Sequence, residues 1–112
     1  MASYNDQFLV AKNEISSIVF VEPPVWTYCS CIEFAKWKTG HEGERWGNAE
    51  NIQPNIIVPE IGDFVLIENH LATIIEKKQN EIQVDEGNWI KCKRTSRWLN
   101  INDKNIRGYV RI

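Results

Sequence analysis

Residues 63–88 read DFVLIENHLATIIEKKQNEIQVDEGN, and this stretch indicates how the chain folds. Three apolar runs, 63–68, 71–77 and 82–88, alternate with short polar segments, which is typical of β-strands joined by tight turns. The polar segment 77–81 fits the turn of a hairpin. The stretch therefore predicts three consecutive strands of an antiparallel meander.

A helix is predicted before these strands, over residues 31–39. Ser30 has the character of an N-cap, and Glu33 follows three residues later, as in a capping box. Gly40 is suited to end the helix. Cys31 is therefore expected in the first helical turn.

The remaining segments complete an α+β fold. Residues 91–99 and 107–112 predict two more strands of the same antiparallel meander, and the glycine- and proline-containing segment 40–62 predicts a long loop. Residues 5–17 are expected to form a short helix within a poorly defined N-terminal segment, 1–24, which ends at two prolines.

Length and composition indicate one globular domain over residues 1–112. The net charge of -2 argues against a nucleic-acid partner, because phosphate binding favours a basic surface. No apolar run is long enough for membrane insertion. The N-terminus lacks the pattern of a signal peptide, so we expect synthesis in the cytoplasm.

The chain has three cysteines, and this odd number leaves at least one thiol free in a monomer. Cys29 and Cys31 are too close for an easy bridge, and we expect no disulfide framework. The cysteines and histidines do not have the paired two-residue spacing that is typical of a zinc site. The sequence accordingly predicts neither a metal nor a cofactor.

The strand period places polar side chains among apolar ones. Glu86 shares a face of its strand with Val84, and Asn88 continues that face. If the hairpin turn is centred near residue 79, Ile74 faces Val84 and His70 faces Asn88, with Glu86 diagonal to His70. An imidazole, a carboxylate and an amide are thus expected on one inner surface.

Packing of the predicted helix on this sheet would bring Cys31 to His70. The helix dipole and an imidazolium both stabilise a thiolate, and His70 could then act as base and acid. Glu86 or Asn88 would orient the imidazole; the residues alone do not decide which. His41 is a rival base, and a structural role for the buried cysteine and histidine is the alternative to catalysis.

Short motifs in this order carry a family resemblance. They are CIEFAKW (31–37), WGNA (46–49), PEIGDFV (59–65), NHLATIIE (69–76), VDEGNW (84–89) and GYVR (108–111). Their order and separations resemble the CHAP family of cysteine, histidine-dependent amidohydrolases/peptidases, as found in phage endolysins. The resemblance implies a papain-like, NlpC/P60-type fold, with a nucleophile helix packed on a curved antiparallel sheet of about five strands.

The resemblance also implies a function: cleavage of amide bonds in peptidoglycan, with Cys31 as nucleophile, His70 as base, and Glu86 and Asn88 as the orienting pair. The enzyme would act on the cell wall, as a phage lysin does. Trp26, Trp46 and Trp89 could line the cleft and stack on sugar rings. The alternatives are a non-catalytic glycan- or protein-binding module and a thiol hydrolase or transferase that acts on another amide or thioester.

Overall fold

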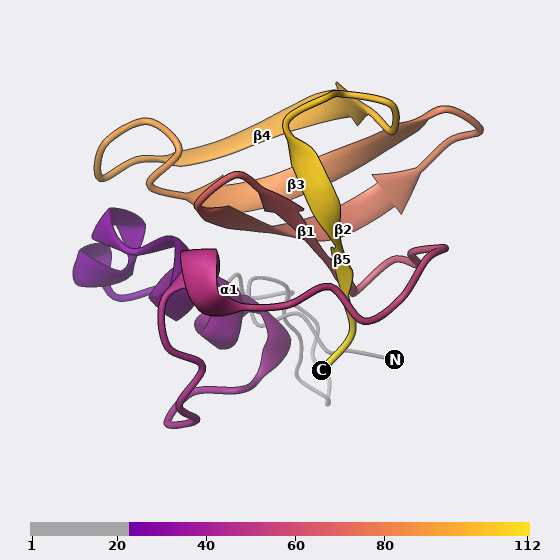
Figure 1. Cartoon of the computed structure of the whole chain (residues 1–112). Helices are drawn as coiled ribbons and strands as arrows, with labels where there is room; N and C mark the ends of the chain where they lie inside the picture. The colour runs from indigo at the N-terminus through magenta and orange to yellow at the C-terminus, as the bar shows by residue number, and fades with distance from the viewer. Residues whose placement is uncertain (1–22) are drawn as a thin grey trace, which may run out of the picture.

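The computed structural model describes residues 23–112, which form an α+β fold (Figure 1). Within these residues a single α-helix precedes a five-stranded antiparallel sheet. The elements are η1 (Val25–Cys29), α1 (Cys31–Thr39), η2 (Ala49–Asn51), β1 (Phe64–Ile67), β2 (His70–Lys77), β3 (Glu81–Gly87), β4 (Arg94–Asn100) and β5 (Ile106–Val110). The helix expected over residues 5–17 lies outside the described residues.

The sheet has the strand order β4-β3-β2-β1-β5. Strands β1 to β4 form a meander as predicted, and the predicted pairing of Ile74 with Val84 in its central hairpin is confirmed, although the register shifts between Ile74 and Glu76. The prediction that the meander continues through the fifth strand is wrong, because β5 returns to pair with β1 rather than continuing beside β4. Position along the chain does not reveal which edge the last strand joins.

Helix α1 has the predicted bounds and the predicted caps. The Ser30 hydroxyl accepts a hydrogen bond from the backbone N–H of Glu33 at 3.1 Å. Gly40 adopts a left-handed conformation with φ of 78°, which a residue without a side chain adopts at no steric cost. The Ser30 cap fixes where the helix begins, and hence the place of Cys31 in its first turn, and Gly40 fixes where it ends.

Two apolar clusters lie on opposite faces of the sheet. Ile32 and Ala35 of α1 pack against Phe64, Leu66 and Leu71 on one face. The alternate strand residues, which point the other way, form the second cluster: Val65, Ile67, Ala72, Ile74, Ile82, Val84 and Leu99. Ile106 of β5 also packs against this second cluster, so side chains from both edge strands meet there and the sheet must curve.

The helix thus covers the face that carries Leu71, not the face of Val84 on which it was expected to pack. It reaches His70 all the same, because His70 is the first residue of β2 and lies at the end of that strand. Figure 1 shows α1 and η1 together on one side of the sheet.

The structure corrects the expectation about cysteine pairing. Cys29 and Cys92 form a disulfide, although 63 positions separate them in the sequence. An odd count guarantees one free thiol but does not prevent the other two from pairing, and here η1 lies beside the loop between β3 and β4. The free cysteine is Cys31.

No helix in residues 23–112 is long and apolar enough to cross a membrane.

Candidate active site

Cys31 is the first residue of α1 and its side chain is partly buried. Burial alone would raise the pKa of this thiol, but a hydrogen bond to His70 and backbone N–H groups of Leu71 and Ile32 more than offset burial, so the pKa is lowered. Because each of these donors favours the charged form, the site stabilises a thiolate.

His70 connects Cys31 to a carboxylate. Its Nε2 atom lies 2.9 Å from Oε1 of Glu86, and both side chains are buried. Burial opposes the protonated imidazole, yet the bonds to Cys31 and Glu86 outweigh burial and raise the pKa of His70. The pair therefore favours thiolate and imidazolium over thiol and neutral imidazole.

Glu86 is fully buried and is held by β4 as well as by His70. Arg97 donates from Nε to Oε2 at 2.7 Å and from Nη2 to Oε1 at 3.2 Å. The Thr95 hydroxyl donates to Oε2 at 3.0 Å. Burial would raise the pKa of this carboxyl, but His70 and Arg97 hold it below its usual value.

Arg97 and Thr95 were not among the predicted site residues. The signal for them is strand parity: both share a face of β4 with the buried Leu99, and Thr95 pairs with Glu86 across the β3–β4 ladder. Parity places Arg97 and Thr95 beside Glu86 only once the register between β3 and β4 is known. The sequence does not give this register, because the loop of residues 88–93 separates the two strands.

Trp89 packs against the His70 ring. Its ring centroid is 5.2 Å from that of His70, and the Arg97 guanidinium sits 3.8 Å from its centroid on the face of the indole. Such a cation–π contact is favourable where water is partly excluded. Arg97 therefore touches both the carboxylate that binds His70 and the aromatic ring that covers it.

Asn88 does not join this group. It has a left-handed backbone with φ of 66°, and its Oδ1 accepts a hydrogen bond from the Cys92 backbone N–H at 2.8 Å. The parity argument failed here because β3 ends at Gly87, one residue earlier. Asn88 shapes the loop, and the structure brings Glu86 alone of the two candidates to His70.

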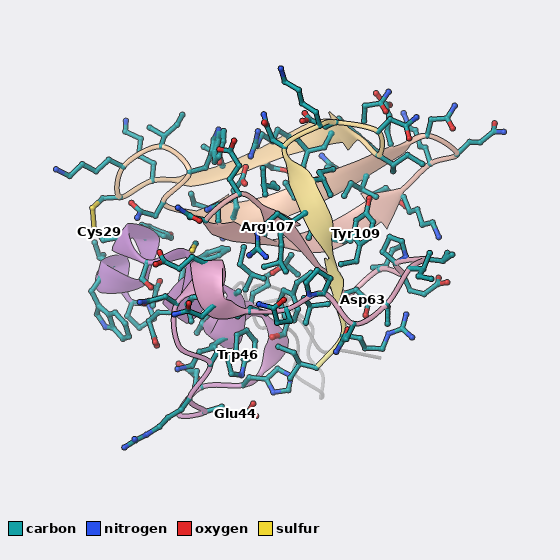
Figure 2. The ribbon with its side chains drawn as sticks, viewed as in Figure 1. Cys29, Glu44, Trp46, Asp63, Arg107 and Tyr109 are labelled. Carbon is teal, nitrogen blue, oxygen red and sulfur yellow. A yellow bond between two sulfur atoms is a disulfide. The ribbon has the colours of Figure 1, made fainter. Side chains whose placement is uncertain are left out.

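The other predicted residues have other surroundings. Trp46 packs edge-on against Phe64 at 5.3 Å and donates from Nε1 to Glu44, in the loop labelled in Figure 2. Trp26 is 60% exposed on η1. The rival base His41 contacts Glu44 through Nδ1 at 2.6 Å, in the turn after α1.

A buried ion pair helps to fix α1 against the sheet. Nζ of Lys38 lies 2.8 Å from Asp85 of β3, and Arg94 of β4 binds the same carboxylate through Nε and Nη2. Asp85 and Glu86 are neighbours that point to opposite faces. Asp85 therefore holds the helix that carries Cys31, and Glu86 holds His70.

Thiol, imidazole and carboxylate together make a relay suited to nucleophilic catalysis at a carbonyl. The backbone N–H of Cys31 has no acceptor within its own helix because it opens the first turn, so it could bind an oxyanion. Within residues 23–112, no group of three or more His, Cys, Asp or Glu side chains could hold a metal ion.

Comparison with known proteins adds no relative: no family model, curated protein or solved structure matches the chain significantly.

Proposed function

We propose that this protein is a papain-like cysteine hydrolase of the CHAP type, which cleaves amide bonds in peptidoglycan. The observation that carries the proposal is the relay from Cys31 through His70 to the buried Glu86, with His70 and Glu86 2.9 Å apart. A histidine that binds both a free thiol with a lowered pKa and a fully buried carboxylate is the arrangement that thiol hydrolases need.

The reaction follows from the protonation states. The Cys31 thiolate attacks the amide carbonyl carbon, and the oxyanion accepts a hydrogen bond from the Cys31 backbone N–H. The His70 imidazolium gives its proton to the leaving amine as the C–N bond breaks, which leaves a thioester on Cys31. Neutral His70 then takes a proton from water, the resulting hydroxide attacks the thioester, and the carboxylate product leaves.

The wall substrate rests on the ordered motifs from residue 31 to residue 111 and not on the relay, which many thiol enzymes could share. Exposed aromatic or apolar side chains that could contact a sugar or peptide ligand are Trp26 on η1 and Trp89 and Ile90 in the loop after β3. Glu86 alone takes the orienting role in this proposal.

The test is turbidity loss of purified bacterial cell walls. We expect clearing by the parent chain, none by Cys31→Ala or His70→Ala, and near-parent clearing by the matched control His41→Ala. Failure of the parent on several wall types, together with a Cys31 that iodoacetamide does not modify at neutral pH, would refute the hydrolase proposal and favour a binding module.

A second candidate function keeps the relay but changes the substrate. Val25, Trp26 and Ile90 are each more than half exposed and apolar, which would suit an acyl chain or another apolar group. A thiol hydrolase or transferase of this kind would hydrolyse short acyl thioesters in a Cys31-dependent manner and leave cell walls intact.

A further inference from the structure

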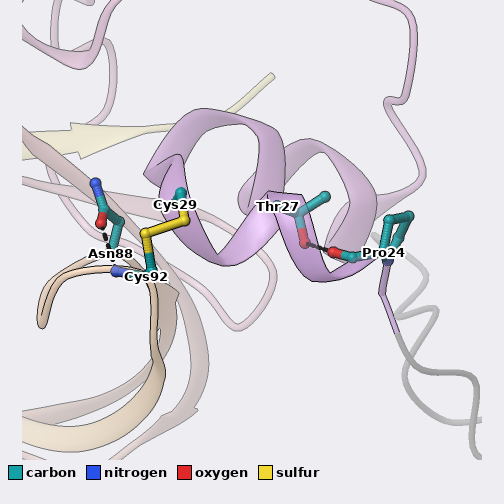
Figure 3. The surroundings of a disulfide bond; sticks show 5 residues. All are labelled: Pro24, Thr27, Cys29, Asn88 and Cys92. Carbon is teal, nitrogen blue, oxygen red and sulfur yellow. Dashed lines mark hydrogen bonds between the residues drawn. A yellow bond between two sulfur atoms is a disulfide. The ribbon is translucent and has the colours of Figure 1, made fainter.

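We propose that the Cys29–Cys92 disulfide is a redox-sensitive clamp that completes the catalytic site when oxidised and loosens it when reduced. This inference concerns the regulation of the relay and rests on the proposed function only in calling the relay catalytic. Its basis is the position of the disulfide, which joins the two chain segments that flank the relay (Figure 3).

One half of the clamp adjoins the nucleophile. Cys29 is the last residue of η1, and Ser30, the N-cap of α1, separates it from Cys31. The backbone of η1 is held to Ser30 by the bond from the Ser30 N–H to the Thr27 carbonyl at 3.1 Å. A constraint on Cys29 is therefore a constraint on the start of the helix that carries the thiolate.

The other half belongs to the loop that covers the base. Cys92 lies in the segment between β3 and β4, which is closed by bonds from Asn88 N–H to the Lys93 carbonyl and from Lys93 N–H to the Ile90 carbonyl. Trp89, which packs on the His70 ring, belongs to the same loop. The disulfide thus ties this loop, and its indole, to the helix of the nucleophile.

Besides the disulfide, the contacts of Trp89 with His70 and Arg97 tie this loop to the rest of the fold. Trp89 and Ile90 are 43% and 52% exposed, and residues 91–93 are exposed as well. Asn88 and Cys92 both have left-handed backbones; asparagine tolerates this conformation, but cysteine adopts it only when its surroundings hold it there. Loss of the disulfide should therefore release the loop before it affects the sheet.

The Cys29–Cys92 disulfide is also accessible to a reductant. Both of its cysteines are exposed, and Figure 2 shows the disulfide at the margin of the molecule. Exposed disulfides are accessible to thiolate attack and include the labile, regulatory ones, whereas buried structural bridges resist reduction.

The redox step needs a dithiol reductant. One of its thiolates attacks a sulfur of the clamp, the Cys29–Cys92 bond breaks, and a mixed disulfide forms. The second thiol of the reductant resolves the mixed disulfide, so two electrons and two protons pass to the protein and the reductant leaves as its disulfide. Cys31 keeps its oxidation state throughout.

Opening the clamp should weaken the relay. Without its tether, Trp89 no longer packs on the His70 ring, so the imidazole can turn away from the thiol and the hydrogen bond between His70 and Cys31 is lost. The pKa of His70 then falls and that of Cys31 rises toward their usual values. The site would accordingly be fully assembled only in an oxidising environment, where disulfides persist.

The test measures the reactivity of Cys31 itself, so it does not depend on the substrate. The oxidised chain and the same chain treated with excess dithiothreitol are exposed to iodoacetamide across a pH series, and the Cys31 peptide is followed by mass spectrometry. We expect one modifiable thiol before reduction and three after it. Reduction should slow Cys31 modification at neutral pH about tenfold, which corresponds to a rise of about one unit in its pKa.

The variant Cys29→Ser/Cys92→Ser should behave as the reduced parent and should not respond to dithiothreitol. An unchanged pH profile of Cys31 in the reduced parent would overturn the proposal, as would three modifiable thiols before reduction. Circular dichroism of the reduced parent at low temperature tests whether the sheet stays folded without the disulfide. If the sheet unfolds, the disulfide stabilises the whole fold, and the clamp proposal is refuted. Fast Cys31 modification without wall clearing would contradict the proposed substrate but leave the clamp intact.

Discussion

Replacing Gly87 with alanine should separate Cys31 from His70, because the new methyl group would meet the helix. Gly87 ends β3 directly after Glu86 and packs beneath α1. An added Cβ would lie 2.8 Å from the Cβ of Phe34, 3.0 Å from its Cγ and 3.2 Å from the Thr27 carbonyl oxygen. These neighbours belong to α1 and η1, so the helix cannot avoid the methyl group by turning a flexible side chain.

The size of the effect follows from this geometry. Moving Phe34 from 2.8 Å to the ordinary contact distance of 3.4 Å requires a shift of about 0.6 Å, and Phe34 is fully buried. Overpacking of a tight core costs about 1–3 kcal/mol. The same shift would lengthen the thiol–imidazole hydrogen bond, which lies on the same helix one turn earlier, and misplacement on this scale can cost about a hundredfold in rate.

The assay is the rate of Cys31 alkylation at neutral pH, beside the free energy of unfolding in urea. The matched control is Gly43→Ala: Gly43 has nothing within 4 Å, but its φ of +88° makes a side chain costly by about 1–2 kcal/mol. We expect both variants to lose stability and only Gly87→Ala to lose Cys31 reactivity, by about tenfold or more. Equal reactivity in the two variants would refute the inferred dependence of the relay on helix position.

Three further expectations concern the carboxylate. Glu86→Gln should lower the pKa of His70 and slow Cys31 alkylation about tenfold. Asn88→Ala should leave the rate of alkylation, and hence the His70 pKa, unchanged, because the Asn88 amide binds the loop and not His70. Arg97→Gln should slow alkylation in the parent and have a smaller effect in a Glu86→Gln background, because there only the contact of Arg97 with Trp89 is left to lose. Fully additive effects in this double-mutant cycle would contradict that. The pKa of Glu86 is lowered in the folded state, so its contribution to stability is present above the usual carboxyl pKa and is lost as the pH falls through the folded pKa. The free energy of unfolding in urea should therefore depend less on pH in the acid range for Glu86→Gln than for the parent.

The sequence was most informative where local rules decide the structure. The capping pattern of Ser30 and Glu33 and the glycine after Thr39 gave the bounds of α1, because helix ends depend on a few neighbouring residues. The short hairpin gave the pairing of Ile74 with Val84, and parity then placed Glu86 on the side of His70. Each of these inferences spans only a few residues or one tight turn.

The sequence was least informative where segments meet across longer connections. The end of β3 at Gly87 removes Asn88 from the ladder, and the loop that follows hides the register which brings Arg97 to Glu86. Pairing of Cys29 with Cys92 likewise depends on where η1 docks, and no local rule fixes that. The CHAP resemblance supplied the substrate class, which no side chain in the described residues identifies by itself.

The burial of Glu86 explains why the site needs more of the fold than a thiol and a histidine. A carboxylate without exposure would be costly unless its oxygens were paired. Here one oxygen faces His70 at the start of β2, and both accept bonds from Arg97 on β4. The edge strand β4 therefore contributes to the relay as directly as α1 does. Any change that detaches β4 from β3 should disable the imidazole before it exposes Cys31, because Glu86 would then lose its Arg97 and Thr95 partners while the helix remained held on β2.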